Sequence, residues 1–544
     1  MPQSVSRPAL LTLIWLLLVF VALLTRPLLP IDETRYLSVA WEMHNSGDWL
    51  VMHLNGALYS HKPPLLFWLI NLGWKVFGVS ELWGRLVAPL FGLASLFLCG
   101  RLAEILWPGR LGSVVRTLTP LILIGALLWT VFTTLTMFDT LVAFFALLGI
   151  LGLLEAERGR MRLGFAVTGV AIGLGVLSKG PVILVYLLPA ALLAPLWARE
   201  RREINWWRWY VGVLLALVLG TAIALAWAVP AAYTGGPEYA DQIFWRQTSG
   251  RVVDSFAHRR PFWWYLPLLP LLLFPWSFWP PLWRGLAWLR RDIDPGIRLC
   301  LIWFGAGLVI FSAISGKQIH YLLPMFPAAA LLLGRFAAGP SGRLTPRDQL
   351  WPSLAILLLG GLLVVAPGAL ATVPKLADRL HLPDWAALVA ELMGGGLIVL
   401  GLVVTRLRTG EPAHAVPTLS ALSIVAVILV HGFGLTAAHE AYDLQPAANL
   451  LHKYEQEQKP IAWVGEYHAE FQFLGRLKKP LQAISRGQIG RWIAVNPKGV
   501  VVMVYSESEV PETEAEPLFR QPHRGRVMII WDRAAFVQDP DLLR

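Results

Sequence analysis

Ionisable residues gather in one polar stretch, residues 31–65, of a chain that is otherwise strongly apolar. The stretch contains Asp32–Tyr36 (DETRY), Gly47–Trp49 (GDW) and Tyr59–Pro64 (YSHKPP), in a chain of 544 residues that is 56% hydrophobic and 15% charged. Carboxylates can take a proton from an attacking group, and fixed cations can stabilise an anion that develops during a reaction. A solvated loop with helix-capping acids is the alternative interpretation, because loops are polar and also carry function.

Membrane-spanning helices must position this stretch, because the chain contains repeated apolar runs such as 10–24 and 214–228. Runs that approach the ~20 residues needed to cross a bilayer predict a polytopic α-helical membrane protein. Arg26 follows the first run without a small-residue cleavage site, which indicates an uncleaved helix rather than a signal peptide. We predict about thirteen transmembrane helices, at 9–28, 82–106, 117–133, 137–155, 163–178, 181–197, 208–230, 263–283, 299–314, 320–336, 351–372, 384–405 and 417–436.

Arginines in alternate loops set the predicted orientation, because basic residues favour the cytoplasmic side. They place the N-terminus in the cytoplasm, and the odd number of spans then places the C-terminus in the periplasm of a bacterial inner membrane. These loops and anionic lipid also explain the net charge of +11 without a nucleic-acid partner. The arginines concerned are Arg110, Arg116, Arg158, Arg160, Arg162, Arg199, Arg201, Arg202, Arg208, Arg284, Arg290, Arg291, Arg298, Arg335, Arg343, Arg347, Arg406 and Arg408.

Composition divides the chain into two predicted domains. Residues 1–437 form the transmembrane domain, with periplasmic loops at 26–81 and 231–262, and amphipathic stretches at 34–45 and 65–77 predict helices along the membrane surface. Residues 438–544 predict a small periplasmic α/β domain, with strands at 461–464, 500–505 and 527–531 and a helix at 446–456. Cys99 and Cys300 lie in or beside apolar spans, which argues against a disulfide framework and a cysteine-based metal site.

The predicted outer face collects more basic than acidic groups, although the orientation rule disfavours cations there. Charges near a bilayer are functional candidates, but long side chains at an interface can also extend to water. An excess of cations beside a few carboxylates suits an anionic ligand such as a phosphate next to a general base. The groups are Asp32, Glu33, Arg35, His61, Lys62, Asp139, Lys179, Arg246, Arg251, His258, Arg259, Arg260, Lys317 and His320.

The order of these motifs resembles the 4-amino-4-deoxy-L-arabinose transferases that act on lipid A. Those enzymes and the protein O-mannosyltransferases belong to the lipid-linked GT-C glycosyltransferases. The resemblance extends over nearly the whole chain, and as a set the motifs are specific. Beyond the first loop they are Phe138–Thr140, Ser178–Gly180, Phe244–Trp245, His258–Trp263, Ser315–Lys317 and Tyr321–Pro324.

The resemblance implies a GT-C fold, a periplasmic active site and a role for each matching residue. Asp32 would be the general base or would orient the acceptor, with Glu33 beside it and Asp139 as a second carboxylate near the reaction centre. The polyprenyl phosphate would be surrounded by Tyr59, Lys62, Arg259, Arg260, Lys317 and Tyr321. Further substrate contacts would come from Arg35, Lys179, Arg246 and Arg251.

Two departures from the family pattern leave the metal and the substrates open. His61 stands where the transferases usually have Glu, and the positions of His61 and His258 have been linked to zinc in the family. Two imidazoles could bind zinc, or a histidine could hydrogen-bond the phosphate, and no cofactor is expected to be required. Residues 246–251 lack the acidic and histidine-bearing pattern of lipid A transferases, so the sugar and the acceptor stay open.

The leading hypothesis is an inverting glycosyltransferase that moves one sugar from undecaprenyl phosphate to lipid A or another envelope glycan. Its partners would be the lipid-linked donor, a lipid or glycan acceptor and membrane lipids. Protein O-glycosylation is the alternative among enzymes. A lipid-sugar flippase is the alternative from another class, although transporters tend to place charges at the bilayer midplane in repeated halves. A non-catalytic scaffold would make the C-terminal domain the functional part.

Overall fold

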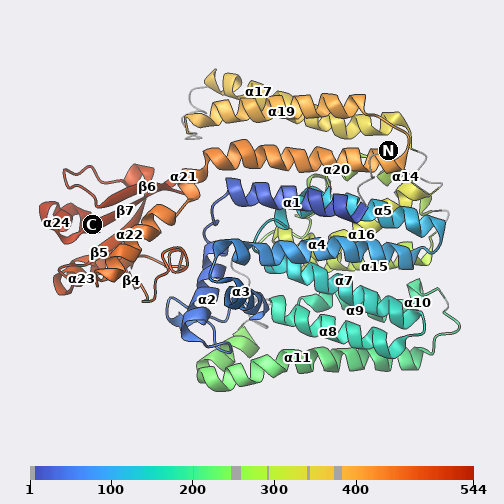
Figure 1. Ribbon diagram of the computed structural model, residues 1–544, viewed down its shortest axis with the longest axis horizontal. Helices are drawn as coiled ribbons and strands as arrows, with labels where there is room; N and C mark the ends of the chain where they lie inside the picture. The colour runs from blue at the N-terminus through green and yellow to red at the C-terminus, as the bar shows by residue number, and fades with distance from the viewer. Residues whose placement is uncertain are drawn as a thin grey trace. The chain divides into compact units, whose positions relative to one another are not determined.

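The computed structural model describes residues 7–199, 201–246, 259–290, 293–339, 344–372 and 383–543 (Figure 1). Its contacts divide the chain into two compact units. The first comprises Met1–Ala22, His61–Leu66 and Arg85–Gly434, and the second comprises Leu23–Ser60, Phe67–Gly84 and Leu435–Arg544. The second unit therefore combines most of the first predicted outer loop with the C-terminal chain. The predicted domain boundary between residues 437 and 438 stays a prediction.

Ten helices in the described ranges are long and apolar enough to cross a membrane, which makes the chain a multi-pass membrane protein. Consecutive long helices pack against one another, as α7 does on α8, α8 on α11 and α17 on α19. The spans are α1 (Arg7–Thr25), α4 (Glu81–Leu106), α7 (Phe138–Glu157), α8 (Met161–Lys179), α11 (Trp206–Asp241), α15 (Pro295–Ala313), η3 with α16 (Ile319–Met325, Phe326–Ala338), η5 with α17 (Pro346–Gln349, Leu350–Ala371), α19 (Trp385–Arg406) and α20 with η6 (Pro412–Leu429, Val430–Leu435).

The predicted count of about thirteen spans is not confirmed, because three predicted spans are interrupted. The first breaks into α5 (Arg110–Ile124) and α6 (Leu127–Phe132), and the second breaks into α9 (Ile183–Leu192) and α10 (Ala194–Trp197). The third, at 263–283, contains only α13 (Leu269–Leu272), η2 (Trp276–Phe278) and the start of α14 (Pro280–Trp288). Prolines, which lack an N–H group, interrupt this last segment. The break between α5 and α6 lies at Gly125, where the chain packs so closely that a Cβ would lie 2.7 Å from Ser420 Cα.

Glycines allow α7 and α8 to pack very closely as an antiparallel hairpin joined by residues 158–160. A Cβ on Gly152 would lie 2.4 Å from Thr168 Oγ1, and a Cβ on Gly164 would lie 2.4 Å from both the Gly152 oxygen and the Ala156 nitrogen. Small residues at a helix interface let two backbones approach within a membrane. The hairpin therefore places the start of α7 and the end of α8 at the same end.

The second unit contains the helices of the first loop and a mixed sheet. Its sheet has the order β4-β3-β5-β7-β6; β3 is parallel to β4 and β5, whereas β7 is antiparallel to β5 and β6. The three predicted strands are confirmed as β3, β5 and β7. The elements are α2 (Asp32–Ser46), β1 (His53–Leu54), β2 (Ala57–Leu58), α3 (Leu65–Phe77, from Phe67 on), α21 (His439–Tyr442), α22 (Gln445–Gln456), β3 (Ile461–Val464), β4 (Gln482–Ile484), η7 (Arg486–Gln488), α23 (Ile489–Val495), β5 (Val500–Ser506), η8 (Glu507–Glu509), β6 (Phe519–His523), β7 (Arg526–Asp532), α24 (Arg533–Gln538) and η9 (Pro540–Leu543).

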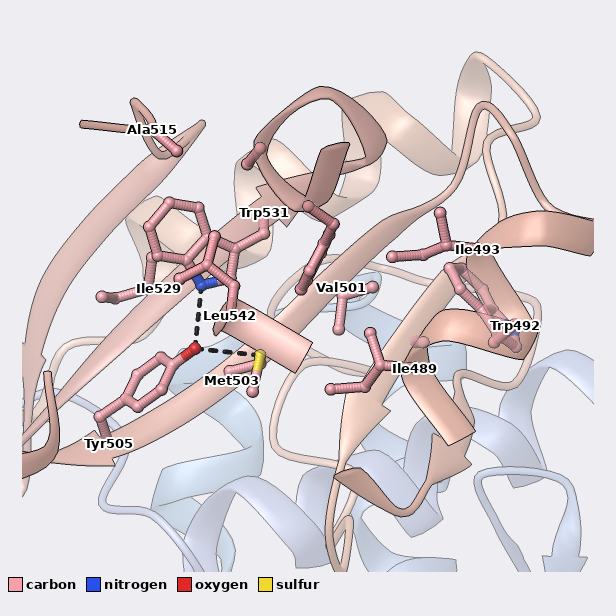
Figure 2. Packing of buried hydrophobic residues seen from close by; sticks show 13 residues of the cluster. Ile489, Trp492, Ile493, Val501, Met503, Tyr505, Ala515, Ile529, Trp531 and Leu542 are labelled. Atoms are coloured by element: carbon pink, nitrogen blue, oxygen red, sulfur yellow. Dashed lines mark hydrogen bonds between the residues drawn. The ribbon is translucent and has the colours of Figure 1, made fainter. Parts of the chain in front are cut away.

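An apolar core on one face of this sheet holds the strands together (Figure 2). Trp531 and Tyr505 are 2% exposed, and the Trp531 indole N–H donates to the Tyr505 hydroxyl at 3.2 Å. That hydroxyl lies 3.1 Å from the Met503 sulfur. Buried Tyr and Trp polar atoms need partners, so the pair satisfies itself inside the core. Helices α23 and α24 cover this face of the sheet and contribute Ile489, Trp492, Ile493, Ala535 and Phe536 to the core.

The close packing of α7 on α8 generates the first prediction. Gly164→Ala places a methyl group against backbone atoms, which cannot move as a flexible side chain can, and should destabilise the protein by about 1–3 kcal/mol. The matched control is Gly361→Ala in α17, where a Cβ meets no atom within 4 Å. Thermal unfolding in detergent should show a lower midpoint for the first variant only. Equal midpoints would contradict the close approach.

Candidate active site

Asp139 and Lys179 form a buried ion pair in the first unit, and other candidate residues of this unit lie around it. Lys179 Nζ lies 2.6 and 2.7 Å from the two carboxylate oxygens of Asp139, and these side chains are 13% and 5% exposed. Asp139 lies in the first turn of α7 and Lys179 at the end of α8. The negative charge of Asp139 therefore lies at the N-terminal end of α7 and the positive charge of Lys179 at the C-terminal end of α8, where each interacts favourably with the helix dipole. The hairpin brings together two groups that are forty residues apart.

His320 and Tyr321 in η3 complete this group, which we call the aspartate–lysine cluster (Asp139, Lys179, His320, Tyr321). His320 Nε2 lies 3.8 Å from Asp139 Oδ2, and the Lys179 ammonium lies 4.5 Å from the centre of the Tyr321 ring. The Tyr186 hydroxyl donates to the Tyr321 carbonyl at 2.8 Å and fixes this turn. The cluster thus combines one carboxylate, one lysine, one imidazole and one phenol in a poorly hydrated place.

Lys62 lies next to the cluster, with its Nζ 5.9 Å from the centre of the Phe138 ring. Phe138 directly precedes Asp139, so the His61–Pro64 part of the YSHKPP motif, which belongs to the first unit, lies beside the FDT motif. His61 is exposed, whereas Lys62 is half-buried. Lys62 and Lys179 together carry two positive charges against the single carboxylate of Asp139, which suits an anionic ligand.

Lys317 joins two predicted outer segments. Its Nζ donates to the Arg260 carbonyl at 3.1 Å and also to the Ile314 carbonyl. An antiparallel bridge pairs Arg259 with Gly316, and Arg260 N donates to the Ser315 carbonyl at 3.1 Å. Lys317 is 3% exposed, and burial lowers its pKa below the usual lysine value. Lys317 therefore holds the segment from which the exposed Arg259 and Arg260 side chains project.

Asp32 presents an exposed carboxylate in the second unit. Its side chain is 57% exposed at the start of α2, where it accepts hydrogen bonds from Arg35 and, at 3.1 Å, from the Tyr36 hydroxyl. Burial acts against the Arg35 cation, but Tyr59, Tyr36 and Asp32 outweigh it and raise the Arg35 pKa. Tyr59 is 3% exposed. Asp32, Arg35, Tyr36 and Tyr59 form a second group, the Asp32 group.

Glu33 forms a buried ion pair with Arg26, a residue that the sequence motifs did not indicate. Arg26 and Glu33 are 2% and 3% exposed, Arg26 Nη2 lies 3.2 Å from Glu33 Oε1, and Leu29 N donates to Glu33 Oε2 at 3.1 Å. With both of its oxygens engaged, Glu33 is suited to fixing the start of α2, and Asp32 is better suited to take a proton. The sequence signal for Arg26 was a lone cation directly after the first apolar run.

Three of the predicted residues cannot be placed. Arg251 and His258 lie outside the described residues, and Arg246 ends η1 (Gln242–Arg246) without a described side chain. Within the described ranges, no three or more His, Cys, Asp or Glu side chains gather as metal ligands do. The zinc pair His61 and His258 therefore stays a prediction. His320, which the sequence had grouped with the ionisable residues of the outer face without a specific role, lies in the cluster.

Comparison with known proteins agrees with the motifs. The family model of dolichyl-phosphate-mannose-protein mannosyltransferases matches residues 61–227. An undecaprenyl phosphate-alpha-4-amino-4-deoxy-L-arabinose arabinosyl transferase from Yersinia pestis is 29% identical over 65% of this chain. That match spans 63% of the length of the Yersinia relative. A Pseudomonas fluorescens transferase of the same name, numbered 2, is 27% identical over 89% of this chain and 91% of its own.

A solved structure shows the same fold. ArnT from Cupriavidus metallidurans, crystallised with undecaprenyl phosphate, superposes with a TM-score of 0.73 at 22% identity and covers 97% of this chain and 98% of its own. Its apo state gives a TM-score of 0.70. The ArnT-like fold is thereby established, and the family resemblance predicted from the motifs is confirmed.

The buried pair generates the second prediction. Lys179→Met leaves the Asp139 carboxylate without its cation and should destabilise the protein by about 3–5 kcal/mol. A double variant, Asp139→Leu with Lys179→Met, removes both charges and should recover much of that loss. The measurement is the thermal unfolding midpoint in detergent.

The matched control is Lys453→Met, which breaks the exposed pair of Lys453 with Glu457 on the second unit. This change should alter stability by less than about 1 kcal/mol. A double variant as unstable as Lys179→Met would show that the uncompensated charge is not the cause.

Proposed function

We propose that this chain, a homologue of the ArnT-like GT-C glycosyltransferases, transfers a single sugar from a polyprenyl phosphate to an extracytoplasmic acceptor. Undecaprenyl phosphate is the proposed carrier, and lipid A or another envelope glycan is the proposed acceptor. The observation that carries this proposal is the aspartate–lysine cluster beside Lys62, in which the cations outnumber the carboxylate. The protein would act at the periplasmic face of a bacterial inner membrane.

The reaction breaks the bond between the anomeric carbon and the phosphate oxygen of the donor. The electron pair of that bond leaves with the polyprenyl phosphate, whose negative charge increases in the transition state. Fixed cations in a site of low water content stabilise such charge strongly. The acceptor oxygen forms its bond on the opposite face of the anomeric carbon, which inverts the configuration there.

Each predicted residue receives a role in this reaction. Lys62, Arg259 and Arg260 would bind the phosphate, with Tyr59 and Tyr321 as hydroxyl donors. Lys179 neutralises Asp139, so this carboxylate does not repel the phosphate, and Lys317 maintains the segment that carries the two arginines. Arg35, Arg246 and Arg251 remain proposed as further substrate contacts.

Asp32 is the proposed general base, because its carboxylate is the more exposed one at the start of α2. A hydroxyl acceptor would give its proton to Asp32 as the new glycosidic bond forms. A phosphate acceptor is already an anion and has no proton to lose. Asp32 would then orient Arg35 and the acceptor instead, and Glu33 would keep the helix start in place.

Transfer assays with the purified protein provide the third prediction. Wild type should move sugar from an undecaprenyl-phosphate donor to lipid A, whereas Asp32→Asn should lose about 10²–10⁴-fold in rate with a hydroxyl acceptor because it cannot take a proton. Lys62→Ala should lose rate with every acceptor, because the phosphate loses a cation. Radiolabelled sugar in the product is the measurement.

The control variant Glu104→Gln alters a half-buried ion-pairing carboxylate on α4 and should keep wild-type activity. Glycan and protein acceptors tested in parallel identify the acceptor class, since the matching family model describes protein mannosyltransferases. The proposed enzymatic activity would be refuted if the wild-type protein moved labelled lipid-sugar across liposome membranes without transferring the sugar. Full activity of Asp32→Asn would show that Asp32 is not the general base.

Metal removal provides the fourth prediction. Lysines and arginines supply the positive charge in the proposed reaction, so transfer should persist after treatment with a chelator, and elemental analysis should find equal, negligible metal in wild type and His258→Ala. A loss of transfer that zinc restores, with less metal in His258→Ala, would show instead that the His61 and His258 positions hold a metal ion.

A further inference from the structure

The helix that presents Asp32 is tied to a distant part of the chain within the second unit. Ser38 Oγ donates to the Ala469 carbonyl at 2.7 Å and accepts from Phe473 N at 3.2 Å. Ser38 is completely buried, so its hydroxyl satisfies two backbone groups that have no access to water. One turn further along α2, the Trp41 indole N–H donates to the Leu477 carbonyl at 2.8 Å. We call residues 469–481 the anchoring segment.

Aromatic contacts add to these hydrogen bonds. The Arg476 guanidinium lies 3.8 Å from the centre of the Phe473 ring and 5.5 Å from the Trp41 ring. Phe473 stacks on Trp74 of α3, with ring centres 5.3 Å apart and planes 1° from parallel. Arg476 and Ala469 both adopt positive φ, at 51° and 60°. Non-glycine residues adopt this conformation at a cost, so the surrounding contacts must hold the segment in its shape.

The β1–β2 hairpin closes a third connection. Asn55 Nδ2 donates to the Leu481 carbonyl at 2.9 Å, and its Oδ1 accepts from Leu481 N and Gln472 Nε2, both at 2.8 Å. Glu42 of α2 accepts from the backbone N–H groups of Asn55 and Gly56. The helix, the hairpin and the anchoring segment are therefore bonded pairwise.

We propose that the anchoring segment is a positioning element for the transfer reaction, an inference that rests on the function proposed above. An α-helix rises 1.5 Å per residue, so Ser38 and Trp41 hold α2 about 9 and 14 Å from Asp32 along one rigid rod. The bonds at these two points fix the rotation and tilt of α2. They thereby fix the direction in which the Asp32 carboxylate meets the acceptor. Ser38 and Trp41 act through Asp32 and are positioning residues.

A purely structural role makes a different prediction from a positioning role. If the segment only holds the C-terminal chain in place, its loss lowers the amount of folded enzyme without changing turnover per folded molecule. If it orients Asp32, turnover falls while donor binding is retained, because small displacements of a reacting group reduce rate strongly. The kcat per folded molecule, measured together with the donor KM, therefore separates the two.

The experiment uses the full chain in lipid nanodiscs with the variants Ser38→Ala and Trp41→Phe. Trp41→Phe keeps an aromatic ring beneath Arg476 but removes the N–H group that bonds Leu477. Both variants should lower kcat by roughly tenfold, with the donor KM changed less than about twofold. Hydrogen–deuterium exchange should rise by roughly tenfold at residues 32–36, because the start of α2 opens more often.

The matched control is Ser353→Ala, which removes a buried serine of α17 whose hydroxyl donates to the Gln349 carbonyl at 2.8 Å. It should leave kcat and exchange at 32–36 unchanged. Unchanged exchange in Ser38→Ala, increased exchange with wild-type kcat, or an equal loss in the control would each overturn the inference. Wild type that transfers no sugar would refute the proposed function instead, and the exchange data would then decide by themselves whether the segment anchors α2.

Discussion

The ion pair between Lys179 and Asp139 is the interaction on which the charged centre of the first unit depends. Both groups are nearly removed from water, and a single buried charge at this place would be costly. The pair exists because α7 and α8 form a tight hairpin whose glycines let the backbones approach. Helix dipoles, glycine packing and the ion pair all favour the same arrangement. His320 and Tyr321 lie against this ion pair.

The Asp32 carboxylate in the second unit has a different environment from that of Asp139. Asp32 stays largely exposed, whereas its neighbour Glu33 is buried with Arg26. Consecutive residues on a helix point in different directions, so one carboxylate can fix the helix and the next can meet a substrate. The anchoring segment, which is more than four hundred residues away in the sequence, also holds α2 in place. The C-terminal chain thereby becomes part of the machinery that presents Asp32.

The lysines of the first unit also divide their roles. Lys179 compensates a carboxylate, Lys317 bonds two backbone carbonyls, and Lys62 lies against an aromatic ring next to Asp139. Only a subset of the cations named by the motifs is therefore suited to direct phosphate contact. Lys62 and the exposed Arg259 and Arg260 are the best suited.

The sequence by itself determined the membrane class, ten of the helical spans, the three central strands and the resemblance to a known family, because apolar run length, alternation and ordered motifs are local signals. It could not determine that three further spans break, since proline positions and the approach of Ser420 to Gly125 act through packing. The partners of Asp139, Glu33 and Lys317 were likewise invisible, because each lies on another element or beyond a turn. Ser38 and Ala469 are separated by 431 residues, and only the tertiary structure brings that hydroxyl to that carbonyl.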